Sequence, residues 1–135
     1  MKIKTSALIR TALNWAVAKC ETKHPIYHRN YSVLEEKLGI KGYNISVETK
    51  YDSLGRNYNP PYSPSTDWAQ GGPIIEREKI STTIDHSGLW IAFNGYNYSD
   101  EKEFVQCDRS QLIAAMRCYV ASKLGNEVDI PEELV

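Results

Sequence analysis

The residues best placed to do chemistry lie together in one segment, 62–78, with the sequence YSPSTDWAQGGPIIERE. This segment combines hydroxyl, amide, carboxylate and guanidinium groups with a tryptophan. Hydroxyl, amide and arginine groups donate hydrogen bonds to phosphates and carboxylates, and an aromatic ring can stack on a nucleobase. We therefore predict a ligand-binding site made of nine residues: Tyr62, Ser65, Thr66, Asp67, Trp68, Gln70, Gly71, Gly72 and Arg77.

Two prolines and a glycine pair predict the backbone that would position these groups. Ser63 followed by Pro64 is typical of a helix start, because serine caps helices and proline is tolerated at the first helical position. Gly71 and Gly72 predict the end of that helix, and Pro73 fits the start of a second one. We expect a helix-glycine-helix elbow, near which the unpaired N–H groups of helix ends converge.

Two other interpretations of the same segment stay open. Asp67, Glu76 and Glu78 could satisfy the helix ends themselves, as the helix dipole favours, which would make the elbow a self-capped structural unit. Asp67 and Glu76 could also form the carboxylate pair of a metal-dependent hydrolase, although such pairs arise by chance in acidic motifs. The segment has neither a Walker lysine nor a dinucleotide fingerprint, so we expect a binding protein without a cofactor rather than an enzyme.

Candidate catalytic and metal-binding residues elsewhere are fewer. His24 and His28 are four residues apart, but Pro25 disrupts a regular helix between them, so we expect no metal site. Cys107 and His86 would act as nucleophile and base only if the fold brought them together. The three cysteines lack the spacing of metal ligands, which predicts reduced thiols.

Length and composition are those of one domain spanning residues 1–135. The chain holds nine tyrosines and three tryptophans against two phenylalanines, and such amphipathic rings suit pockets and interfaces as well as cores. The net charge of −1 gives no general attraction to nucleic acid or to anionic lipid. No apolar run is long enough to cross a membrane, so we expect a cytoplasmic protein that binds neither membrane nor nucleic acid.

Hydrophobic periodicity predicts the elements around the central segment. Apolar residues recur at helical spacing in two segments, 9–20 and 112–124. Alternating or β-branched residues predict short strands in six segments: 1–4, 43–51, 81–84, 89–93, 103–107 and 127–130. This order predicts an α+β fold, with two main helices on one face of a small antiparallel sheet.

Three blocks of the sequence resemble a known family. They are LNWAVAKC at 13–20, YSPSTDWAQGGPIIERE at 62–78 and LIAAMRCYVASKLGNEVDIPEEL at 112–134. These blocks are similar to NinX-like proteins, small accessory proteins of lambdoid and related phages. The resemblance implies a phage protein that works in the cytoplasm of a bacterial host, and it implies no enzymatic activity.

This context and the central segment together predict a non-catalytic binder of a small anionic, nucleotide-like ligand. Its role would be to sequester a host metabolite or a defence signal. The alternative is an interaction module that binds a host or phage protein through tyrosine and tryptophan side chains. The apolar stripe of residues 112–124 could also serve a homodimer.

Overall fold

The computed structural model describes residues 1–21, 50–51, 54, 57–58, 62–95 and 104–135. In chain order the elements are β1 (Lys2–Lys4), η1 (Thr5–Ala7), α1 (Arg10–Glu21), β2 (Lys50–Tyr51), β3 (Asn57–Tyr58), α3 (Trp68–Glu78), β4 (Ile80–Ile84), β5 (Trp90–Asn94), β6 (Gln106–Asp108), α4 (Gln111–Leu124), β7 (Glu127–Asp129) and η4 (Glu132–Leu134). Strands pair in three groups, β4-β5-β6, β1-β7 and β2-β3, all antiparallel. The predicted α+β class is confirmed.

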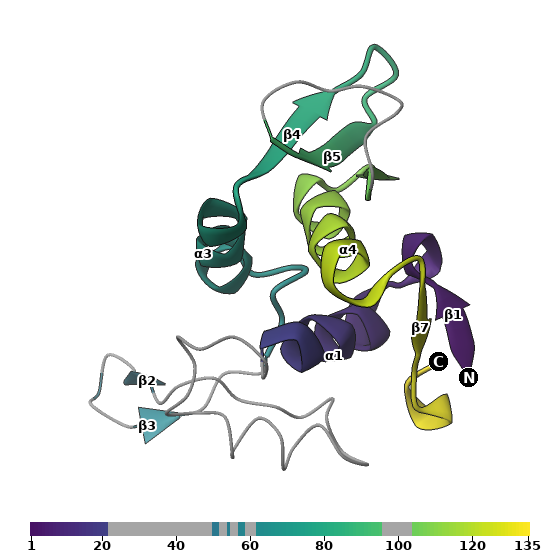
Figure 1. The fold of residues 1–135 in the computed structure, drawn as a ribbon. Helices are drawn as coiled ribbons and strands as arrows, with labels where there is room; N and C mark the ends of the chain where they lie inside the picture. Colours follow the sequence, from purple (N-terminus) through teal and green to yellow (C-terminus); the bar gives the residue numbers. More distant parts are fainter. Residues whose placement is uncertain (22–49, 52–53, 55–56, 59–61, 96–103) are drawn as a thin grey trace.

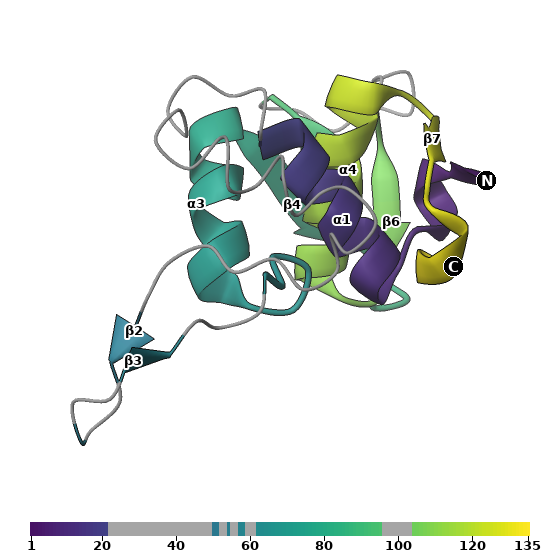
Figure 2. The same cartoon turned by 90° about the horizontal axis from the view of Figure 1, so that it is seen from below.

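Helix α4 is central to the fold because α1, α3 and the β4-β5-β6 sheet all pack against it (Figure 1). Figure 1 shows the β4-β5 hairpin above α4 and α1 below it, and in the view from below in Figure 2 α1 lies in front of α4. Ala114, Ala115, Met116 and Tyr119 of this helix are fully buried. A helix that is buried on several sides is apolar around much of its circumference, as α4 is. The predicted pair of helices on the sheet therefore differs from the structure, because α1 packs on α4 instead.

The predicted strands 81–84 and 89–93 are present as β4 and β5, which form a hairpin that pairs from Ile80 opposite Asn94 to Ile84 opposite Trp90. Strand β6 then pairs with β5. One face of this sheet lies on α4, where the amide of Gln111 donates a hydrogen bond of 2.8 Å to the hydroxyl of Thr82. Among the described residues, no helix has the length and apolar character needed to cross a membrane.

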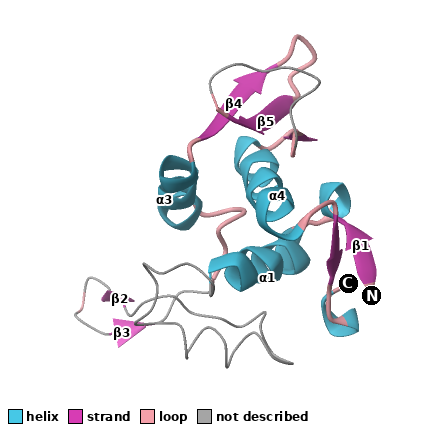
Figure 3. Cartoon of the chain, in the orientation of Figure 1, coloured by secondary structure: helices cyan, strands magenta, loops and turns pink. Residues whose placement is uncertain are grey.

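The two ends of the chain lie side by side, as Figure 3 shows. Strands β1 and β7 pair there, and the Met1 amino group donates to the carbonyl oxygen of Ile130 at 2.9 Å. Short strands were predicted at both ends, and both are confirmed. Of the predicted strand 43–51 only residues 50 and 51 are described, as β2, and the His24–His28 pair lies outside the described residues.

Arg117 of α4 is buried. Its Nε donates to the carbonyl oxygen of Leu8 at 2.9 Å. Its Nη1 donates to the carbonyl oxygen of Cys107 at 2.9 Å and to the carboxylate of Asp108 at 3.0 Å. This arginine therefore ties α4 both to the segment before α1 and to β6.

Candidate functional site

The predicted helix-glycine-helix elbow is wrong, because a single helix, α3, runs from Trp68 to Glu78 through both glycines and Pro73. Asp67, rather than Ser63, caps its N-terminus. The helix ends at Lys79, whose φ of 56° lies in the left-handed region that a glycine usually occupies. Lys79 still donates its backbone N–H to the carbonyl oxygen of Glu76.

Pro73 is tolerated inside α3 for two local reasons. Proline clashes with the Cβ of a helical residue before it, and Gly72 has no Cβ. Pro73 also removes the hydrogen bond that would reach the carbonyl group of Ala69. Both Ala69 and Pro73 are exposed, so water can take the place of the missing donor.

Gly71 is required by packing and not by its backbone angles. A Cβ atom at this position would lie 2.4 Å from the carbonyl oxygen of Pro64 and 2.6 Å from Cδ1 of Leu112. Glycine therefore lets α3 approach both α4 and the turn that precedes α3. At Gly72, by contrast, an added Cβ would meet no atom within 4 Å outside its chain neighbours.

The N-terminus of α3 is capped by the protein itself. The carboxylate of Asp67 accepts a hydrogen bond of 2.9 Å from the N–H of Ala69, and its carbonyl oxygen accepts from Gln70 and Gly71. The side chain of Gln70 donates to Asp67 at 3.2 Å and accepts from the N–H of Ser63 at 2.7 Å. These contacts match the self-capped interpretation of the segment, and they place a negative charge where the anion was predicted.

Two other predicted ligand residues face the interior. Ser65 is buried, and its hydroxyl donates a hydrogen bond of 2.7 Å to the side-chain oxygen of Asn14 on α1. Tyr62 is also buried and belongs to the hydrophobic core. Only Thr66, between Ser65 and Asp67, is exposed in this turn. The turn thus fastens the start of α3 to α1.

Arg77 lies one residue before the end of α3 and takes part in a buried ionic network. Its Nη2 donates to Glu21 of α1 at 2.6 Å and to the hydroxyl of Tyr119 at 3.2 Å. Its Nε donates to Glu78 at 3.1 Å, and Lys123 of α4 pairs with the other oxygen of Glu78 at 2.9 Å. Three helices meet in this network, and the Glu21 side chain within it is only 3% exposed.

The network shifts the pKa values of three of its members, Arg77, Tyr119 and Glu78. Burial alone would lower the pKa of Arg77, but hydrogen bonds to Glu21 and the charge of Glu21 raise it above its usual value. Burial and the charge of Glu21 raise the pKa of Tyr119, which therefore stays a neutral phenol. Burial would raise the pKa of Glu78, but the hydrogen bonds from Lys123 and Arg77 hold it below its ordinary value. The guanidinium of Arg77 is thus a cation already matched by two carboxylates.

The opposite side of α3 makes an exposed surface that we call the outward face. Helical spacing places five residues on it: Trp68, Ala69, Gly72, Pro73 and Glu76. Trp68 is 52% exposed, and each of the other four is exposed or half-buried. In the part of the chain that the structure describes, Glu76 forms no ion pair. The outward face thus combines one large ring with small or rigid neighbours.

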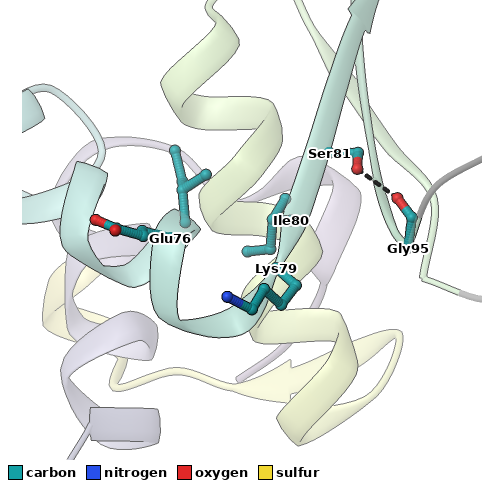
Figure 4. Close-up of a pocket in the computed structure, with 6 residues that line it drawn as sticks. Glu76, Lys79, Ile80, Ser81 and Gly95 are labelled. Atoms are coloured by element: carbon teal, nitrogen blue, oxygen red, sulfur yellow. Dashed lines mark hydrogen bonds between the residues drawn. The ribbon is translucent and has the colours of Figure 1, made fainter.

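A pocket of about 520 Å³ lies at the C-terminal end of the same face (Figure 4). Ile75 and Glu76 of α3 line it, together with Lys79, which follows α3, and Ile80 and Ser81 at the start of β4. Figure 4 shows the hydroxyl of Ser81 turned away from α3 toward Gly95, where it donates to the carbonyl oxygen. The volume is that of a small-molecule or side-chain pocket, and its lining is mostly apolar.

The structure gives no support to either catalytic alternative. Asp67 and Glu76 lie at opposite ends of α3, roughly 13 Å apart along its axis at 1.5 Å per residue. Among the described residues, no group of three or more His, Cys, Asp or Glu side chains could hold a metal ion. Burial and the charge of Asp85 raise the pKa of the exposed Cys107, whereas an activated nucleophile needs a lowered pKa.

Glu21 and Tyr119 belong to the ionic network around Arg77, although neither was predicted as a site residue. One signal was present for Glu21, because Leu13, Val17 and Glu21 are spaced by four residues and so share the buried side of α1. A carboxylate on a buried stripe calls for a cation, and Arg77 supplies it. No pattern in the sequence, however, shows which cation that is.

A comparison with known protein families gives a match. The model of the family described as Bacteriophage P22, NinX, matches residues 4–123, which include α1, α3 and nearly all of α4. No curated protein matches the chain. The match covers most of the 135 residues and confirms the resemblance carried by the three sequence blocks. The chain therefore belongs to the NinX family of phage proteins.

Proposed function

We propose that this phage protein is a non-catalytic binding module that recognises a host or phage protein through the outward face of α3. The observation that carries this proposal is the exposure of Trp68, half of whose surface is open at the first position of the helix. Tryptophan is enriched among the residues that dominate protein interfaces, because it covers a large area at a small entropic cost.

The neighbours of Trp68 suit close approach by a partner. Ala69 and Gly72 are small, and Pro73 is rigid, so another protein can contact the indole ring and the helix together. Glu76 lies at the far end of the face and supplies a polar group of the kind found at interface rims. This arrangement favours a helix that docks into a groove or onto a flat surface of its partner.

The contacts that Arg77 and Asp67 make within the protein favour a protein partner over a small anion. Arg77 is paired with Glu21 and Glu78, and the carboxylate of Asp67 occupies the helix N-terminus. Binding of a nucleotide-like ligand by the nine residues remains a prediction. A thermal-shift panel of nucleotides tests it, because a ligand at 100 times its dissociation constant adds about 2.7 kcal/mol of stability.

Affinity capture from phage-infected bacteria tests the protein-binding proposal. The tagged wild type should capture at least one protein, and the purified pair should bind saturably. Trp68→Ala should weaken this binding about 30-fold or more, as expected for a residue at the centre of an interface, while the melting temperature stays unchanged. Ile9→Ala is the matched control, because Ile9 is 48% exposed but lies outside α3. Equal binding by Trp68→Ala and wild type would contradict the proposal.

A further inference from the structure

Strand β4 lies at an edge of the described β4-β5-β6 sheet, and its own sequence lacks the charges and proline that usually protect edge strands. One side of β4 pairs with β5, and no strand of the described residues pairs with the other side (Figure 1). Its sequence, ISTTI, has no charge and no proline, and every residue except Ser81 is β-branched. Edges of this kind readily pair with a further strand.

The sequence of β4 is nearly symmetric about Thr82. If two copies pair as antiparallel strands around this residue, Ile80 lies opposite Ile84 of the second copy and Ser81 lies opposite Thr83. An interface with twofold symmetry requires a surface that complements itself, and this strand meets that requirement. We infer that two copies of this chain associate through their β4 edges, with a twofold axis at Thr82.

The residues that flank β4 complement each other in the same register. Lys79 is exposed and forms no ion pair among the described residues, and the symmetry brings it close to Asp85 of the second copy. Ile84 is 52% exposed and comes to lie opposite Ile80, which lines the pocket shown in Figure 4. Each copy thus covers an exposed isoleucine of the other, and every such contact occurs twice.

The product is one continuous antiparallel sheet of six strands, three from each copy. Paired residues of antiparallel strands share a face, so both α4 helices lie on the same side of this sheet. The outward face of α3 is not part of β4. The dimer therefore rests on observations that are independent of the proposed protein partner.

Sedimentation or light scattering of the full chain tests the dimer in a concentration series that reaches about 1 mM, above the dissociation constants of weak specific dimers. The mass should rise from monomer to dimer. Ile84→Lys should raise the dissociation constant at least about 100-fold, because two buried isoleucines are lost per dimer. Ile9→Lys is the matched control and should leave it unchanged. If Ile84→Lys unfolds, Thr83→Lys on the exposed side of β4 serves instead.

The register is tested by oxidising Thr82→Cys in a Cys107→Ser background. The twofold axis brings the two new thiols within disulfide range, so a covalent dimer should form faster than from Ile9→Cys. A monomer at every concentration, or equal cross-linking at both positions, would overturn the inference. Trp68→Ala should still dimerise, and Ile84→Lys should still capture the proposed partner, so the two proposals can fail separately.

Discussion

Helix α3 has two faces that use their residues in opposite ways. The inward face consists of Gly71, Ile74, Arg77 and Glu78, and packing or paired charges account for each of them. The outward face exposes Trp68 and the carboxylate of Glu76. A single helix can therefore carry a structural cluster on one side and a recognition surface on the other. Polar residues in a motif are informative about binding only once their partners are known.

Breaking the ionic network of the inward face should cause the largest loss of stability among substitutions in α3. Arg77→Met leaves Glu21 buried without a cation, which should lower the free energy of unfolding by about 3–5 kcal/mol in urea denaturation. The double variant with Glu21→Gln removes the stranded charge and should recover much of this loss. A loss below about 0.5 kcal/mol for Arg77→Met would show that the network does not hold the helices together.

Gly71 and Gly72 are adjacent in α3 but lie on its inward and outward faces, so the same substitution should affect stability differently at each. Gly71→Ala forces a methyl group against Pro64 and Leu112 and should lower stability by about 1–3 kcal/mol. Gly72→Ala should change it by less than about 1 kcal/mol, because the gain in helix propensity opposes crowding against Pro73. Chemical denaturation measures both variants, and equal effects would mean that Gly71 is not a packing glycine.

Lowering the pH should weaken the ionic network of the inward face, with a smaller effect on stability than the substitutions above. The pKa of Glu78 is lowered in the fold, so its stabilising contribution is present above its ordinary pKa of 4.5 and is lost as the pH falls through the lower folded value. The melting temperature of Glu78→Gln should therefore decline less steeply below pH 4.5 than that of the wild type. Parallel curves would show that its pairs with Arg77 and Lys123 contribute little.

Most elements of the described fold could be predicted because they depend on local patterns. The stripes of α1 and α4, the cap at Ser110, the turn at Gly125 and the β4-β5 hairpin all follow from short-range rules. The arrangement of α1 on α4 could not be predicted in this way, because contacts between distant segments decide it.

The central segment shows where such rules fail. A Gly-Gly-Pro sequence is usually a helix stop, and here the close approach of α3 to Pro64 and Leu112 explains Gly71 inside a helix. The polar residues predicted to bind a ligand lie close together in the sequence. Two of these residues, Ser65 and Arg77, have partners more than fifty residues away in the chain, Asn14 and Glu21. No sequence pattern specifies such pairs.

Quenching of tryptophan fluorescence by acrylamide tests most directly whether the outward face of α3 is the recognition surface. Trp68 is the most exposed of the three tryptophans, since Trp15 is buried and Trp90 is half-buried. The captured partner should reduce the quenching of the wild type, because it covers the indole ring of Trp68. It should cause no such reduction in Trp68→Phe. A partner that binds saturably and leaves the quenching of Trp68 unchanged would contradict the assignment of recognition to the outward face.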